Sequence, residues 1–547
     1  MDMSQRAKSA MPSRIDSEVQ EYLSVQGQRR RLFPRAALVG VLSGGLAVAF
    51  RWALAGVEAL RDGLITWAHH YPTWGWLLPP LFGALGAGIA VRLVSQVAPE
   101  AAGSGIPHLK AVVYRLRSMR WSRILPVKFV GGVLAIGGGL ALGREGPTVQ
   151  MGGAVGAVVA RWLKVSTRER QTLIAAGAGA GLAAAFNAPL AGLAFVLEEV
   201  QRHFAPTVFG AAFVAALTAD IVTRSLTSQL PVFHVAPYPT LPLLLLPAFL
   251  VVGLLTGLLG VAFNRGLLCS LDLFAWWGRW LSRRSVWPAR LAGAFVGASA
   301  GVLAWWVPDA IGGGHRLVDA VLAGHVALSL IPLWFLLRFS LTMGSYGCGA
   351  PGGIFAPLLV LGALIGLAVG DLTQWVLPWA IDDPEAFAVV GMAAYFAAIV
   401  RAPITGIVLI VEMTNTYAQM LALLVACFSA YAVAELLEDH PIYEALLERD
   451  LARDGRPAEL HQPQVVELMV QEGSRFDGTP VHALGLPAGC VLVMLRRGLG
   501  EIVPTADTHL EAGDRIIAVI APQATHALLV LREGCETART RRPDTLS

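Results

Sequence analysis

Residues 143–147 read Gly-Arg-Glu-Gly-Pro, and residues 349–357 read Gly-Ala-Pro-Gly-Gly-Ile-Phe-Ala-Pro; each stretch interrupts a long apolar region. A third interruption, residues 103–107, reads Gly-Ser-Gly-Ile-Pro. Glycine and proline break helices, and irregular backbone at membrane depth is tolerated only where it is buried in protein or lines a cavity. We therefore expect the three breaks to surround the functional site of an α-helical, polytopic membrane protein.

The composition around these breaks also indicates a membrane protein. Of the 547 residues, 55% are hydrophobic and only 15% are charged, whereas a soluble chain holds about a quarter charged residues. The net charge of +4 does not indicate a nucleic-acid partner. The five cysteines are scattered without metal-ligand spacing, so we expect no disulfide framework, metal site or cofactor. An enzyme is the least favoured class, because no catalytic Ser/His/Asp or His-Glu-x-x-His pattern lies in the apolar region.

The pattern along the chain predicts five parts. They are a polar N-terminal segment (1–34), a transmembrane domain (35–445), a linker (446–462), a small α/β domain (463–535) and a disordered tail (536–547). The basic run Arg29–Arg31 precedes the first apolar stretch, so we expect the N-terminus to be cytoplasmic and the helix to be retained. The α/β domain is expected to contain strands at 465–470, 491–495 and 516–520 and a helix at 525–532.

An internal repeat runs through the transmembrane domain. At an offset of 210, Lys128 meets Arg338, Gly143 meets Gly353 and Pro147 meets Pro357. At an offset of 214, Ala188-Pro189 meets Ala402-Pro403 and Glu198 meets Glu412. Two homologous halves with helices broken at corresponding positions are typical of transporters whose site lies between the repeats, near the bilayer midplane.

Glu145 stands at one of the breaks. An ionisable residue at that depth costs at least about 2.5–3.5 kcal/mol by insertion scales, which favours a functional role over a structural ion pair with Arg144. The loop's amides and a helix N-terminus would accommodate either this carboxylate or an anion that replaces it. Ser104 adds a hydroxyl donor, and the helix beginning near Phe355-Ala356 adds further amides. Neutral donors of this kind suit an anion that must both bind and leave.

These motifs, with Phe186–Gly192, Arg401–Pro403 and Pro441–Tyr443, resemble the CLC family of chloride channels and chloride/proton antiporters over about residues 35–445. The resemblance implies inverted repeats, a homodimer with one pathway per subunit, and a bacterial inner (plasma) membrane location with both termini cytoplasmic. It also implies the roles of the site residues: Ser104 and Tyr443 donate hydroxyls to a central chloride, Glu145 is the gating glutamate, and the anion site is completed by Gly105, Ile106, Ile354 and Phe355. Gly143, Arg144, Pro147, Gly353 and Pro357 form the structural motif.

Glu199 distinguishes an antiporter from a channel in this resemblance. It matches the family's internal proton glutamate, which channels replace with an apolar residue, whereas Glu198 has the repeat partner Glu412 and is expected to be structural. A carboxylate relay would let protons cross the dry stretch to Glu145. The alternative is a solvated Glu199 at a helix end. Some proton-coupled relatives carry two acidic residues where this chain has His108 and Lys110, which leaves the internal proton route open.

Chloride and protons are therefore the expected substrates, with a passive chloride channel and an antiporter for fluoride or nitrate as alternatives. Ser104 favours chloride, because nitrate preference in the family is associated with proline at that position and a fluoride-specialised relative would lack the serine. Residues 510–519 resemble a TrkA-C regulatory module, which implies a small regulatory ligand such as a nucleotide. No phosphate-binding glycine loop supports that ligand, so a dimer-stabilising role is the alternative.

Overall fold

The computed structural model describes residues 14–535 apart from 203–204, 230–231, 234–241, 283–287, 416, 454–463, 499, 522–523 and 525–526. The first residues of the N-terminal segment, most of the predicted linker beyond residue 453 and the predicted tail (536–547) lie outside these. Two compact units divide at Leu447 and Glu448. We describe each unit by itself.

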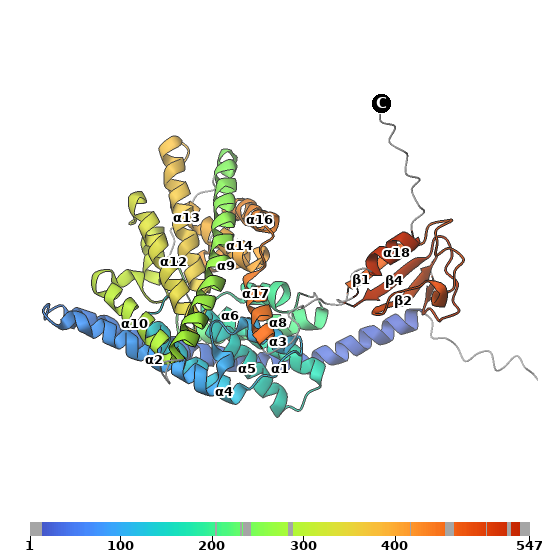
Figure 1. The fold of residues 1–547 in the computed structure, drawn as a ribbon, viewed down its shortest axis with the longest axis horizontal. Helices are drawn as coiled ribbons and strands as arrows, with labels where there is room; N and C mark the ends of the chain where they lie inside the picture. The colour runs from blue at the N-terminus through green and yellow to red at the C-terminus, as the bar shows by residue number, and fades with distance from the viewer. Residues whose placement is uncertain are drawn as a thin grey trace, which may run out of the picture. The chain divides into compact units, whose positions relative to one another are not determined.

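The first unit is built from helices (Figure 1). In chain order they are α1 (Arg14–Ala68), α2 (Leu78–Val97), α3 (Ile106–Val113), α4 (Trp121–Gly137), α5 (Glu145–Trp162), α6 (Thr167–Phe186), α7 (Pro189–Phe195), α8 (Pro206–Leu226), α9 (Leu246–Ser282), α10 (Pro288–Trp306), α11 (His315–Leu322), α12 (Ile331–Gly347), α13 (Phe355–Val376), α14 (Ala386–Val400), α15 (Pro403–Thr414), α16 (Met420–Leu436) and α17 (Ile442–Arg453). The helix α1 begins well inside the polar N-terminal segment, and α17 continues past residue 445, into the segment expected to be a linker.

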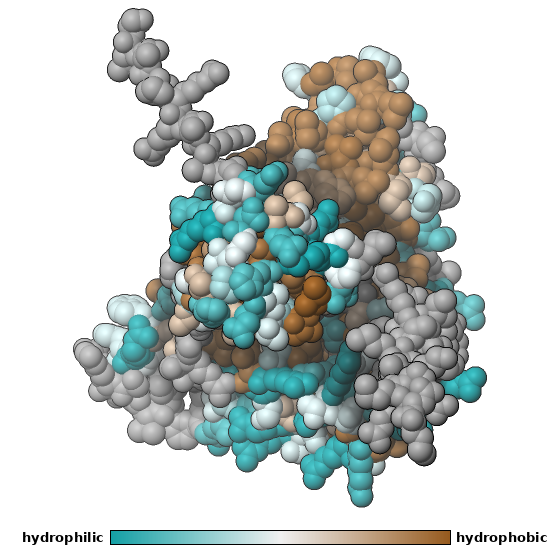
Figure 2. Space-filling view, turned by 90° about the vertical axis from the view of Figure 1, so that its right-hand side faces the viewer, coloured by the Kyte–Doolittle hydropathy of each residue, from teal (hydrophilic) through white to brown (hydrophobic). Residues whose placement is uncertain are grey.

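The outer helices are apolar on their surfaces. Among the described residues, six helical segments are long and apolar enough to cross a membrane by length and composition. Large hydrophobic side chains such as Leu254 of α9 and Phe428 of α16 are exposed. Figure 2 shows a broad apolar surface in the upper part of the molecule. By contrast, every residue of α14 is buried, as is nearly all of α5, so these two helices form the centre of the unit.

The predicted repeat is confirmed in three dimensions. The short 3₁₀ turn Pro99–Ala101 and α3 recur, 209 residues later, as the turn Pro308–Ala310 and α11. Lys128 Nζ donates to the carbonyl oxygens of Ala101 and Gly103 at 3.0 and 2.6 Å. Its repeat partner, Arg338, donates through Nη1 to those of Ala310 and Gly312 at 2.8 and 3.0 Å. In each half, a buried cation therefore holds the loop that begins the short helix.

Glu198 and Glu412 make equivalent contacts, each with the opposite half of the unit. The Glu198 carboxylate accepts hydrogen bonds from the amides of Ile404 and Thr405 at the start of α15, at 3.2 and 2.7 Å. The Glu412 carboxylate accepts them from Leu190 and Ala191 at the start of α7, at 3.1 and 2.8 Å. Each carboxylate thus caps a proline-initiated helix of the other repeat, where the first amides lack intrahelical partners.

The second unit holds a four-stranded antiparallel sheet in the order β1-β4-β2-β3 and one helix. Its elements are β1 (Gln464–Met469), β2 (Cys490–Arg497), β3 (Gly500–Ile502), β4 (Arg515–Ile520) and α18 (Ala527–Cys535). Three of these strands were predicted; β3 is an additional short strand paired with the end of β2. Just before β4, the guanidinium group of Arg497 donates two hydrogen bonds to the buried carboxylate of Asp514. Nε lies 2.8 Å from Oδ1, and Nη2 lies 2.7 Å from Oδ2. Burial of the carboxyl group raises the pKa of Asp514, but these bonds lower it by more, so that the pKa lies below its ordinary value.

Candidate transport site

The two repeats meet at their glycine-rich breaks. Gly143 and Gly353 exchange backbone hydrogen bonds of 2.7 and 2.8 Å, and Gly103 pairs with the 350–352 segment in the same way. Two residues beyond the first pair, α5 begins at Glu145 and α13 begins at Phe355. The amides at the start of both helices therefore converge on one region, and helix N-termini carry positive partial charge. This is the region predicted from the three breaks.

Glu145 is fully buried at this meeting point. Its carboxylate lies beside the backbone amides of Glu145 itself and of Ala356. Neither carboxylate oxygen, however, has a partner at full hydrogen-bond geometry. The oxygen Oε2 lies against Gly143, where a Cβ atom would overlap it. The carboxylate consequently occupies a space lined by backbone donors without being fixed there, and a small anion could take its place.

Neutral donors surround the same region. Ser104 is fully buried, and its Oγ accepts from the amide of Ile106 at 3.3 Å, so the hydroxyl proton remains available. Gly105 holds the turn between them with a φ of 77°, a left-handed conformation that favours glycine. The hydroxyl of Tyr443, on α17, is buried without a hydrogen-bond partner. An anion between Ser104 and Tyr443 would satisfy both hydroxyls.

The ring of Phe355, at the start of α13, packs against two other aromatic rings. Phe355 is buried and lies 5.1 Å from the ring of Phe186 and 4.4 Å from that of Phe396, centroid to centroid. Ile354, at the N-cap of α13, is also buried. Their side chains are apolar, so at these two positions only the backbone can donate to an anion. Pro147 and Pro357 occupy the third position of α5 and α13, where the missing amide costs no helical hydrogen bond.

Glu199 is buried in a π-helical turn, Val196–Val200, that continues α7. Its Oε1 accepts from Lys110 Nζ at 2.6 Å, and its other oxygen is buried without a partner. Glu199 is therefore not a solvated helix-end residue. Lys110 also lies 3.9 Å from Glu444, which pairs with Arg202. His108 is buried and its Nδ1 lies 3.4 Å from Gln150 Nε2.

Glu444 and Arg202 were not singled out from the sequence. Both lie in polar stretches at helix ends, which is where solvated charges are common, so residue type alone carried no signal for them. Lys110 was noted as a departure from a motif that would favour ionised Glu199 if the two residues were close. An 89-residue separation between Lys110 and Glu199 leaves their contact invisible to any spacing rule.

Comparisons with known proteins agree with this architecture. The model of the family described as "Voltage gated chloride channel" matches residues 86–435, and that of the TrkA-C domain matches residues 465–531. The chain is 43% identical over 422 residues to the H(+)/Cl(-) exchange transporter ClcA of Vibrio parahaemolyticus, covering 77% of this chain and 90% of that protein. It is 42% identical over 422 residues to ClcA of Cronobacter sakazakii, covering 76% and 89%.

A solved structure supports the same assignment. The crystal structure of a slow cyanobacterial Cl-/H+ antiporter superposes with a TM-score of 0.74 at 36% identity, covering 78% of this chain and 99% of that one. Family match, overall identity and fold all extend over the helical unit that holds the three breaks. The chain belongs to the voltage-gated chloride channel (CLC) family.

Proposed function

We propose that the protein exchanges chloride for protons across the membrane, with Glu145 as the gating glutamate. The observation that carries the proposal is the Glu145 carboxylate, buried and without a full hydrogen bond at the meeting point of two helix N-termini. Ionised, this carboxylate competes with chloride for the same amides; protonated, it releases them. One group therefore couples anion occupancy to proton binding. The relatives named as H(+)/Cl(-) exchange transporters support this assignment.

Chloride would bind between Ser104 and Tyr443. The hydroxyls of these residues, with the amides of Gly105, Ile106, Ile354 and Phe355, form a donor set that carries no full positive charge. Such a set binds an anion without trapping it, because each donor contributes only a partial charge. Lys128 and Arg338, the buried cations that the repeat pairs with each other, donate to backbone carbonyls instead.

Glu199 would be the internal proton relay. It is buried, so its ionisation state responds to its surroundings, and its partner Lys110 stabilises the ionised form. Proton uptake then requires the ammonium group to move away from the carboxylate. The nearby Glu444 offers Lys110 a second carboxylate, at 3.9 Å, toward which it can move.

The remaining expectations extend this proposal. The protein would act as a homodimer with one pathway per subunit, in the bacterial inner membrane with both termini cytoplasmic. The TrkA-C-like unit would sense a small ligand such as a nucleotide. The described part of that unit contains the Arg497–Asp514 pair, in which only the carboxylate is buried, and a pair satisfied in this way serves to hold the turn before β4 rather than to bind an anion.

The test is proton uptake by proteoliposomes driven by a chloride gradient at clamped voltage. Wild type should move protons against their gradient. Glu145→Gln keeps the size of the side chain and removes its titration, so proton movement should fall to the level of empty liposomes while chloride flux persists. Voltage-driven chloride current without proton movement in wild type would identify a passive channel. Proton pumping by Glu145→Gln at the wild-type ratio would show that another group is the gate.

A further inference from the structure

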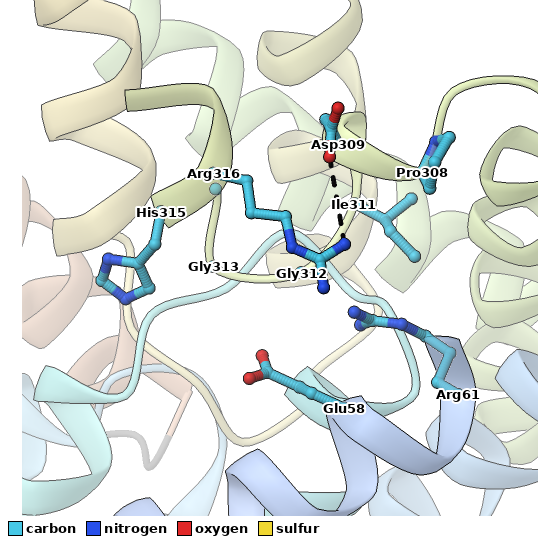
Figure 3. A pocket seen from close by; sticks show the side chains of 10 residues that line it. Glu58, Arg61, Pro308, Asp309, Ile311, Gly312, Gly313, His315 and Arg316 are labelled. Carbon is cyan, nitrogen blue, oxygen red and sulfur yellow. Dashed lines mark ion pairs between the residues drawn. The ribbon is translucent and has the colours of Figure 1, made fainter. Parts of the chain in front are cut away.

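A pocket with a volume of about 80 Å³ lies in the helical unit (Figure 3). It is lined from α1 by Glu58 and Arg61 and, across the cavity, by the loop Gly312–Gly314, His315 and Arg316. Figure 3 shows the Glu58 carboxylate and the Arg61 guanidinium reaching from α1 toward this loop. Its polar lining and volume suit several water molecules. None of these residues belongs to the proposed chloride site.

The contacts of α1 place the pocket and Glu199 toward opposite ends of that helix. Arg35, near the start of α1, bonds to Glu169, and two residues further along α6, Gln171 bonds to Arg115 near the end of α3. The α3 helix also carries Lys110, the partner of Glu199. Glu58 is 23 residues beyond Arg35 on the same helix, or about 35 Å at 1.5 Å per residue. The two carboxylates Glu58 and Glu199 therefore stand toward opposite faces.

The repeat leads to the same placement. The pocket's loop is the counterpart of the Ser104 loop: both begin an eight-residue helix, α11 and α3, and both hold positive φ angles at two glycines. In inverted repeats, corresponding loops approach the centre from opposite sides. The symmetry thus places the pocket on the side of the repeat junction opposite the Ser104 loop.

Its walls are attached to the segment that leads into Glu145. The amide of Gly312 donates to the carbonyl of Gly139 at 3.0 Å, and Arg61 Nη1 donates to that of Gly137 at 3.3 Å. A Cβ atom on Gly313 would lie 3.9 Å from the carbonyl oxygen of Leu142. Arg144 interacts electrostatically with both Glu145 and Glu58. A proton that leaves Glu145 in the direction away from Ser104 therefore passes beside this pocket.

Of the carboxylates that line the pocket, Glu58 is the one available to bind a proton. Asp62 takes the guanidinium groups of Arg61 and Arg316, and Asp309 lies 4.0 Å from Arg316 at the exposed rim. Among the residues that the structure describes, Glu58 forms no ion pair within 4.0 Å and accepts no hydrogen bond, while Arg61 and Arg144 act on it electrostatically. An unpaired carboxylate inside a membrane helix is costly and points to function.

We propose that Glu58 is the proton-transfer residue on the face opposite Glu199, a role that rests on the proposed exchange function. The O–H bond of protonated Glu145 breaks, water in the pocket carries the proton, and an O–H bond forms on the Glu58 carboxylate. Glu58 then gives the proton to bulk water and returns to its ionised form. The reverse sequence loads Glu145 from that face. Arg61 and Arg316, held by Asp62, keep the pocket open and polar.

The experiment measures proton and chloride flux of Glu58→Gln in proteoliposomes, beside wild type and Asp309→Asn. Asp309→Asn removes the same charge at the rim of the same pocket and controls for electrostatic effects. Glu58→Gln should slow proton uptake at least about tenfold, a difference of about 1.4 kcal/mol in barrier height. Asp309→Asn should change it less than twofold. In the Glu145→Gln background, which lacks proton transport, Glu58→Gln should leave chloride flux unchanged.

Two further measurements separate proton transfer from a structural role. Glu58→Asp restores a carboxylate and should recover proton flux in part, and imidazole, a small diffusible buffer added on the Glu58 face, should partly rescue Glu58→Gln. Wild-type proton flux in Glu58→Gln overturns the Glu58 role alone. A Glu58→Gln defect of equal size in chloride flux of the Glu145→Gln background also overturns it. Wild type that moves no protons overturns the exchange function, and the Glu58 role with it.

Discussion

The two repeats of the helical unit agree where they build the scaffold and differ where the proposed chemistry occurs. Lys128 and Arg338 hold equivalent loops, and Glu198 and Glu412 cap equivalent helices in the opposite halves. The candidate site residues have no such counterparts. At an offset of 210 Glu145 meets Phe355, at 214 Glu199 meets Met413, and at the offset of 209 that relates α3 to α11 Ser104 meets Gly313.

This difference shows how a symmetric frame can hold an asymmetric pathway. Paired helix N-termini supply partial charges from both halves, so an anion can be bound at the centre by backbone groups alone. In the proposed mechanism, a titratable group in only one half would make one helix N-terminus responsive to protons, because the matching position in the other half holds Phe355. The prediction that follows is general for this chain: substitutions at matched positions affect stability, and those at unmatched positions affect transport.

The largest effect is expected from Glu199→Gln. Glutamine keeps the shape of the side chain but cannot carry a proton, so proton flux should collapse to the level of empty liposomes while chloride flux continues. The matched control is Glu198→Gln, which changes the adjacent residue in the same way. Flux of both ions is measured in the same vesicles. Equal loss of proton transport in both variants, with normal stability, would show that the pair shares the relay.

A smaller, structural effect is expected from Glu198→Gln and Glu412→Gln. Each substitution replaces a charged acceptor of two backbone amides by a neutral one, and hydrogen bonds to charged groups contribute about 1.5–3 kcal/mol. We expect both variants to unfold at lower temperature in detergent, with the larger loss in Glu198→Gln, because Glu198 also accepts from the Thr405 hydroxyl at 2.8 Å. The ratio of protons to chloride should not change. A changed ratio with wild-type unfolding temperature would contradict the scaffold role.

The fold was largely predictable because its signals are local. Broken apolar segments, the repeat offsets and the alternating strands each depend on residues close in sequence. The sequence missed α3 and α11, since eight residues between glycine loops carry too short a pattern. The boundary between α6 and α7 also lies within apolar sequence, and the structure places it at Asn187, in a left-handed conformation, and Pro189.

The site was predictable only in part, for a physical reason. Glu145 and Ser104 lie within motifs whose glycine and proline announce a break, so sequence alone singled them out. The Lys110–Glu199 pair and the Glu58 pocket are contacts between distant segments; Arg316 reaches Asp62, beside the pocket, across 254 residues. Glu58 sits on a continuous helix without any break around it, and nothing in its neighbourhood of the sequence distinguishes it from an ordinary surface acid.

The smallest expected effect is on anion choice, at Ser104. Ser104→Pro removes the hydroxyl donor, and one hydrogen bond contributes about 0.5–1.5 kcal/mol, so the nitrate to chloride flux ratio should rise by about two- to tenfold. A small spherical anion depends more on each donor than planar nitrate, which spreads its charge over three oxygens. Ser104→Ala removes the hydroxyl without constraining the backbone, and it should produce a shift in the same direction. The counterpart substitution, Gly313→Ala, lies in the loop that lines the Glu58 pocket and not among the proposed anion donors, so it should leave the ratio unchanged. Equal ratios in wild type and both Ser104 variants would show that the backbone amides alone select the anion, and the asymmetry between the repeats would then concern protons only.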